Sequence, residues 1–105
     1  MGVSGHWIVP EHFRTEAMNA IRGLWLGRKI TEATLDDATT QLISADVDVW
    51  PTSPLLPRMR QLADNASAYD AAYVALAEDL GCALVSSDAK FARIPGIRCR
   101  VIGFE

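Results

Sequence analysis

The sequence lacks the features that mark secreted and membrane-spanning proteins. Its two cysteines, Cys82 and Cys99, are too few for a disulfide framework and too widely spaced for a zinc site, so we expect reduced thiols in the core. No apolar run approaches the roughly 18 residues of a membrane span, and no signal peptide opens the chain. We therefore expect a cytoplasmic protein that makes no membrane contact.

The sequence also lacks an excess of positive charge. It holds 10 Lys and Arg against 13 Asp and Glu, a net charge of −3, which argues against attachment to nucleic acid through bulk positive charge. An enzyme that touches a short stretch of RNA stays open, because a metal-binding carboxylate cluster contributes negative charge of its own. Half of the 105 residues are apolar and no repeat or linker divides them, so residues 1–105 predict one compact domain.

Helical and strand-like segments alternate along the chain. Pro10 suits a first helical turn and Gly27 a helix end, while Thr31 and Ser67 are typical N-caps and Gly81 is a typical C-cap. These signals predict helices over residues 10–27, 31–44, 55–63 and 67–80, and strands over residues 47–50, 83–86 and 98–102. The alternation predicts an α/β fold, in which helices cover a parallel sheet.

Apolar patterning distinguishes these helices. Residues 71–77 form an unbroken run, which predicts that helix 67–80 lies in the core against the sheet. The first helix carries an apolar stripe of helical spacing, namely Phe13, Ala17, Ile21, Leu24 and Trp25. The second carries a stripe that we expect to be buried, namely Leu35, Ala38, Leu42 and Ile43. The chain begins with a helix and shows only three short strands, so a central strand is missing from the front of the predicted sheet.

Two acids stand at the border of the predicted core. Asp88 follows strand 83–86, and ligands of open parallel sheets gather outside the carboxyl ends of the strands. Asp88 is placed to reach a metal or a substrate, or it caps the short helical segment that follows. Asp70 comes three residues after Ser67. It either completes a capping box or faces a cation, since an unpaired carboxylate near the core is costly.

A third acid, Glu16, lies in the middle of the first predicted helix, and Asn19 projects from the same face three residues on. Both are either solvated helix side chains or parts of a site. Three acids in three segments fit a hard cation with oxygen ligands, and Mg²⁺ or Mn²⁺ suits them better than zinc because no Cys or His stands with them. The other acids considered are expected on the solvated surface: Asp36, Asp37, Asp46, Asp48, Glu78 and Asp79.

Three stretches of the sequence resemble the PIN domain, and specifically the VapC toxins of bacterial toxin–antitoxin pairs. They are PEHFRTEAMNAIR (10–22), SAYDAAYVALA (67–77), which is the most specific, and LVSSDAKF (84–91). The resemblance implies a three-layer fold with a parallel sheet between helices. It also implies an endoribonuclease that depends on Mg²⁺ or Mn²⁺, usually a homodimer, and inhibited by a cognate antitoxin.

The resemblance assigns roles to five residues. Glu16, Asp70 and Asp88 match acidic active-site positions, so they would be the catalytic metal ligands. Asn19 matches a polar residue that supports the site, and Ser86 matches a Ser or Thr whose hydroxyl could hold a ligand or a water.

The chain departs from the family pattern at its start. PIN domains begin with a hydrophobic strand that lies centrally in the sheet and ends in an Asp, but residues 1–7 contain no acid. We therefore expect a PIN domain that is incomplete at the N-terminus and lacks its first strand, its first helix and one of its four acids.

The sequence is compatible with two kinds of function, an enzyme and a binding module. The first is a VapC-like endoribonuclease that cleaves RNA, with Arg14, Arg22, Lys90 and Arg93 either steering the RNA or acting as ordinary surface charges. The second is a catalytically inactive remnant that keeps only a dimerisation or antitoxin-binding surface. A receiver-like signalling domain is disfavoured, because the paired acids that it needs after a first strand are absent.

Overall fold

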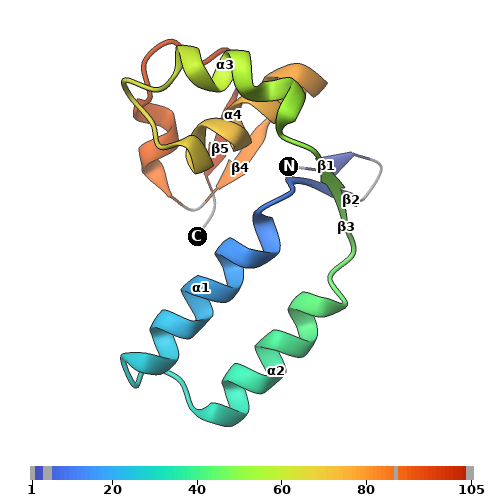
Figure 1. Ribbon diagram of the computed structural model, residues 1–105, viewed down its shortest axis with the longest axis vertical. Coiled ribbons are helices and arrows are strands. Elements are labelled where there is room, and N and C mark those ends of the chain that lie inside the picture. Colours follow the sequence, from blue (N-terminus) through green and yellow to red (C-terminus); the bar gives the residue numbers. More distant parts are fainter. Residues whose placement is uncertain (1, 4–5, 87, 104–105) are drawn as a thin grey trace.

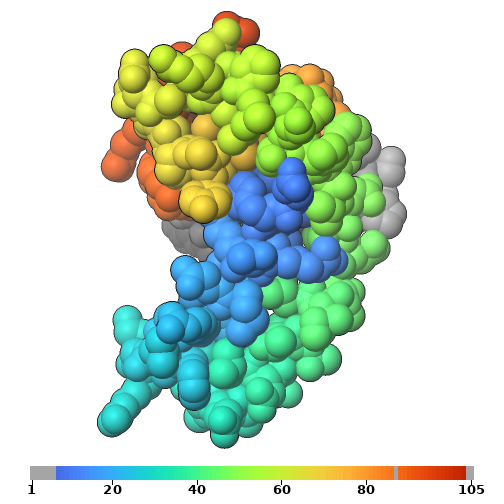
Figure 2. Space-filling model, viewed as in Figure 1, coloured from blue at the N-terminus to red at the C-terminus, as the bar shows by residue number. Residues whose placement is uncertain are grey.

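The computed structural model describes residues 2–3, 6–86 and 88–103, and it has two visibly different parts (Figure 1). Helices and two small sheets form a body, from which a hairpin of two helices projects. The space-filling view shows the hairpin as a lobe of its own (Figure 2), and the molecule measures 41 × 29 × 27 Å.

The elements follow the predicted order, with two strands added at the front. The strands are β1 (Gly2–Val3), β2 (His6–Pro10), β3 (Val47–Trp50), β4 (Leu84–Ser86) and β5 (Val101–Gly103). The helices are α1 (Phe13–Leu26), α2 (Glu32–Ile43), α3 (Leu56–Gln61) and α4 (Ala68–Leu80), with 3-10 turns η1 (Ser53–Leu55) and η2 (Ala89–Arg93). The α/β class is confirmed, and the predicted helices are confirmed to within a few residues.

The strands form two sheets in the described residues, not the one sheet that the sequence predicts. β2 pairs with β3 in parallel and with β1 in antiparallel fashion, while β4 pairs only with β5, in parallel. No described strand joins β2 to β4. The expected absence of the family's first strand stays a prediction.

The expectation that the chain begins with a helix was wrong. Pro10 is the last residue of β2, where it pairs with Trp50, and α1 begins only at Phe13. The strand escaped notice because its apolar core is just Ile8 and Val9, both buried, next to a proline that also suits a helix start. As a result Glu16 lies in the first turn of α1 and not in its middle.

Helix α4 forms the core of the body, as its sequence predicts. Six of its residues are buried, and it packs against both β2 and β4, which ties the two sheets together. Its start is fixed by Ser67, whose hydroxyl accepts a hydrogen bond from the Asp70 amide at 3.1 Å. Its end is fixed by Gly81, whose φ of +66° lies in the left-handed region.

Two glycine substitutions should shift stability in opposite directions. Gly81→Ala should lower the free energy of unfolding by about 1–2 kcal/mol, because a Cβ is strained at positive φ. Gly23→Ala, inside α1 with open space around it, should raise it by about 0.5–1 kcal/mol through helix propensity. Thermal unfolding of both variants checks this, and equal shifts of the same sign would contradict the backbone assignment.

The projecting hairpin leaves its predicted stripes only partly covered. No described residue of α1 or α2 is fully buried, and Leu24, Trp25 and Ile43 are 44%, 37% and 73% exposed. The prediction that the α2 stripe is buried was therefore wrong, because α2 packs mainly against α1, which covers it only in part. The turn after α1 also differs, since Arg28 and not Gly27 has a positive φ, of +59°.

The described residues also bear on the predictions for the two cysteines and for a membrane span. Cys82 and Cys99 are free thiols, half-buried at the edge of the core. No helix in the described ranges has the length and apolar character needed to cross a membrane.

Candidate functional site

Three acids that lie far apart in the sequence line one hollow. Glu16 comes from the first turn of α1, Asp70 from the first turn of α4, and Asp88 from just beyond the carboxyl end of β4. The hollow has a volume of about 240 Å³, and Ser86 also lines it. The fold therefore gathers Glu16, Asp70, Asp88 and Ser86, which the sequence placed in a single site.

The helix starts help to explain why acids can gather here. Glu16 and Asp70 each lie in the first turn of a helix, where unpaired amides carry partial positive charge. That charge stabilises a nearby carboxylate and offsets part of the repulsion between like charges. The cluster is thus compatible with folding before any ligand binds.

Lys90 lies between two of the three acids. Its ammonium is 3.1 Å from Asp70 Oδ2 and 3.4 Å from Asp88 Oδ2. The hydrogen bond to Asp70 raises the pKa of Lys90, and the interaction with Asp88 raises it further. The Lys90 ammonium is therefore charged at neutral pH. The two carboxylates therefore converge on one cation.

Asp88 caps η2, which is one of the two roles that the sequence left open, and it also faces a cation. Its Oδ1 accepts the backbone N–H of Lys90 at 2.9 Å and so caps η2, while Oδ2 faces the ammonium. Its own amide donates to Ser86 Oγ at 3.0 Å, which orients this turn. The bond from the Lys90 amide holds the pKa of Asp88 below its ordinary value. The cap and the charged face use different oxygens, so one role does not exclude the other.

Glu16 is held from across the hollow by Tyr73. The tyrosine hydroxyl donates to Glu16 Oε1 at 2.9 Å. The Tyr73 ring packs edge-on against His12 and Phe91, with centroid distances of 5.3 and 6.5 Å. Burial, and then the bond to Glu16, raise the pKa of the Tyr73 hydroxyl, so it stays a donor at any physiological pH. Glu16 is thereby oriented by a tyrosine whose ring packs against the core.

The donor set of this hollow fits a magnesium-type ion only in part. Within residues 2–3, 6–86 and 88–103, no three His, Cys, Asp or Glu side chains converge closely enough to hold one ion. Asp70 and Asp88 do converge, and Mg²⁺ in proteins commonly uses one or two carboxylates and keeps several waters. The Lys90 ammonium already stands at a cation position between them. Two carboxylate oxygens therefore converge on one cationic group.

Asn19 is not brought to this hollow. It lines a second one, of about 440 Å³, between α1 and α2, together with Arg14 and Arg22. Arg14 donates to the carbonyls of Leu42 and Ala45 at 3.2 and 2.9 Å, so its guanidinium is engaged at the end of α2. Its position ties the two helices together and leaves little of it available to steer RNA.

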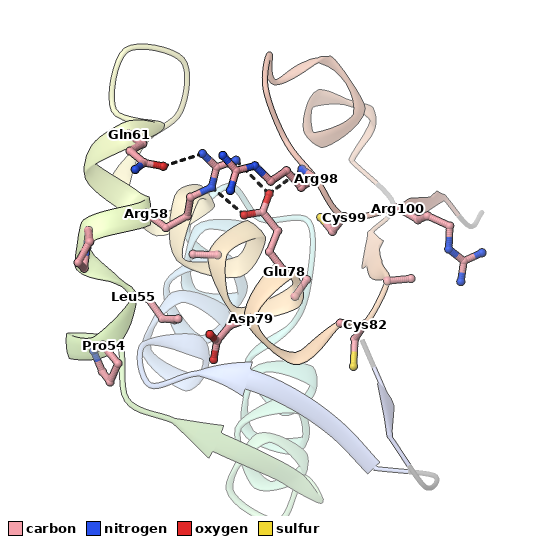
Figure 3. Close-up of a pocket in the computed structure, with 15 residues that line it drawn as sticks. Pro54, Leu55, Arg58, Gln61, Glu78, Asp79, Cys82, Arg98, Cys99 and Arg100 are labelled. Carbon is pink, nitrogen blue, oxygen red and sulfur yellow. Dashed lines mark hydrogen bonds and ion pairs between the residues drawn. The ribbon is translucent and has the colours of Figure 1, made fainter.

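A larger hollow, of about 630 Å³, lies elsewhere and is lined by an ion pair (Figure 3). Arg58 of α3 donates to both carboxylate oxygens of Glu78 at 2.7 and 3.2 Å, and also to Gln61 and the Gly96 carbonyl. The Arg98 amide donates to Glu78 Oε2 at 2.6 Å. The expectation that Glu78 is a solvated surface acid was wrong, since its side chain is only 11% exposed. Because its guanidinium is hydrogen-bonded to these partners, Arg58 has a structural role.

Sequence reasoning missed two residues of the candidate site. Tyr73 interrupts the aliphatic run of α4 one turn after Asp70, and a hydroxyl on that face was a usable signal. Lys90, expected either to steer RNA or to be an ordinary surface charge, lies two residues after Asp88. Its bridge to Asp70 depends on how β4 meets α4, which no local pattern specifies.

Comparison with known proteins agrees with this architecture. A family model described as PIN domain matches residues 2–97, so the chain belongs to the PIN-domain family. Ribonuclease VapC12 of Mycobacterium tuberculosis is 34% identical over 83% of this chain and 67% of its own length. Ribonuclease VapC1 of the same organism is 33% identical over 88% of this chain and 70% of its own. Ribonuclease VapC9 is 42% identical over half of this chain and 41% of its own.

Proposed function

We propose that this chain is a VapC-like toxin of a type II toxin–antitoxin system, an endoribonuclease that uses Mg²⁺ or Mn²⁺ to cut RNA phosphodiester bonds. The observation that carries the proposal is the convergence of Asp70 and Asp88 on one cation, in a hollow that Glu16 also lines. The relatives named as VapC ribonucleases support the same reaction. An enzyme with an RNA substrate would act in the cytoplasm, which stays a prediction.

The residues of the hollow divide the work of such a reaction. A divalent ion held by Asp70 and Asp88 would activate a water and offset the charge of the scissile phosphate. Tyr73 keeps the Glu16 carboxylate aimed at the same hollow, where it could accept a proton from that water. Ser86 fixes the turn that presents Asp88. Each group is thus positioned before substrate arrives, which lowers the cost of orientation.

The partners follow from the same proposal. A toxin of this kind would pair with a cognate antitoxin and with a second copy of itself. The exposed apolar side chains on the hairpin, Leu24, Trp25, Leu26 and Ile43, support a protein-binding surface there. The same surface favours the second candidate function, an inactive module that only binds partners.

Metal dependence distinguishes the two functions. We expect the chain to cleave structured RNA in millimolar Mn²⁺, and cleavage to stop on addition of a chelator. Mn²⁺ should also raise the melting temperature by a few degrees through preferential binding to the folded state, and Asp88→Asn should remove that rise. Asp36→Asn, an exposed acid on α2, serves as the matched control and should retain it. No melting shift and no cleavage in the unmodified chain would favour the binding module.

A further inference from the structure

We propose that Lys90 is a built-in counter-cation that occupies the metal position between Asp70 and Asp88 and must leave before a divalent ion can bind. This inference rests on the proposed metal-dependent function. It adds that Lys90 lowers the affinity of the two acids for a divalent ion. It concerns the regulation of the site by a residue of this chain.

The geometry gives the ammonium of Lys90 the contacts of a bound cation. It lies 3.1 Å from Asp70 Oδ2 and 3.4 Å from Asp88 Oδ2, so each acid contributes one oxygen to it. The Phe91 ring adds a contact at 5.6 Å from its centroid. The Lys90 backbone is anchored as well, because its amide donates to Asp88 Oδ1. The side chain thus projects over the hollow from a fixed point.

The same contacts oppose a second cation. An ammonium and a divalent ion repel each other strongly at the separation that one pair of carboxylates imposes, so both cannot be held there at once. The side chain of Lys90 is 52% exposed, which leaves it room to turn outward when the ion enters. Metal binding is therefore an exchange, and the apparent affinity is lowered by the share of molecules in which Lys90 occupies the position.

The neighbouring Arg93 provides a control for charge alone. It stands on the same short turn, η2, is exposed, and influences Asp88 only as a more distant charge. Replacing Arg93 by Gln removes one positive charge near the site without removing the bridge. Replacing Lys90 by Gln removes one charge and the bridge together. The difference between the two variants isolates the bridge.

Calorimetric titration of the metal-free chain with MnCl₂ tests the inference. Lys90→Gln should tighten Mn²⁺ binding about tenfold relative to the unmodified chain, whereas Arg93→Gln should change it by less than about threefold. Lys90→Arg, which keeps a cation at the bridge, should bind no more tightly than the unmodified chain. Circular dichroism of each variant without metal confirms that the fold is retained.

The outcomes separate this inference from the function on which it rests. If all variants bind Mn²⁺ with the affinity of the unmodified chain, or if Lys90→Gln binds more weakly, Lys90 is not a competing cation and only the inference fails. If neither the unmodified chain nor Lys90→Gln binds Mn²⁺, the proposed metal site fails and the inference with it.

Discussion

Asp70→Asn should lower the rate of RNA cleavage at least about 100-fold and leave the fold intact. Asn has the same shape but no charge, so the pair of carboxylates that converges on the cation position is lost. The loss should exceed the 10- to 100-fold effects typical of residues that only support metal ligands. Initial rates on a fixed RNA at several Mn²⁺ concentrations measure it.

The fold should survive this change for a local reason. The helix start at Ser67 uses the backbone amide of residue 70, which the substitution keeps. The remaining loss, an ion pair with the half-exposed Lys90 and a favourable charge at a helix start, should stay below about 1 kcal/mol. Asp64→Asn, an exposed acid in the turn before α4, is the matched control and should cleave normally. Undiminished cleavage by Asp70→Asn would remove Asp70 from the site.

The second large effect concerns stability and a residue of the other hollow, Glu78. Glu78→Gln should lower the free energy of unfolding by about 2 kcal/mol, because it leaves the Arg58 guanidinium with a weaker acceptor inside a mostly covered pair (Figure 3). For a chain of this size the melting temperature should fall by roughly 10 °C. Asp79→Asn, the exposed neighbour on the same helix, should change stability little.

The effect of Glu78 should also depend on pH. Burial alone would raise the pKa of Glu78, but the hydrogen bonds from Arg58 and Arg98 outweigh it and hold the pKa below its ordinary value of 4.5. The stabilisation is therefore complete above about pH 4.5 and is lost as the pH falls through the lower, folded-state pKa. The gap between the unmodified chain and Glu78→Gln should close over that acidic range. A gap that is constant with pH would contradict the charged pair.

Much of the fold can be read from local signals along the chain. Ser67 and Gly81 bound α4, and its apolar middle predicts its place in the core, because each of these depends only on neighbouring residues. Thr31 caps α2 through the Thr34 amide for the same reason. The α/β class then follows from the order of the elements.

Two features of the fold depend on contacts between distant residues. Strand β2 is defined mainly by its pairing with β3, some 40 residues later, and five residues ending in proline are too weak a pattern alone. The outward position of the α1–α2 hairpin is the second. An apolar stripe shows that a face prefers cover, but it does not say whether a sheet or another helix supplies it.

The sequence by itself was enough to nominate Glu16, Asp70 and Asp88 as candidate site residues, because each stands beside an apolar segment and within a stretch that resembles the PIN domain. Only the tertiary structure decided which side chains they contact. The Lys90 ammonium lies between Asp70 and Asp88, and the Tyr73 hydroxyl donates a hydrogen bond to Glu16. Asn19 lines a different hollow. The physical reason is that side-chain charges pair across elements whose relative placement is set by packing, and packing is a property of the whole chain.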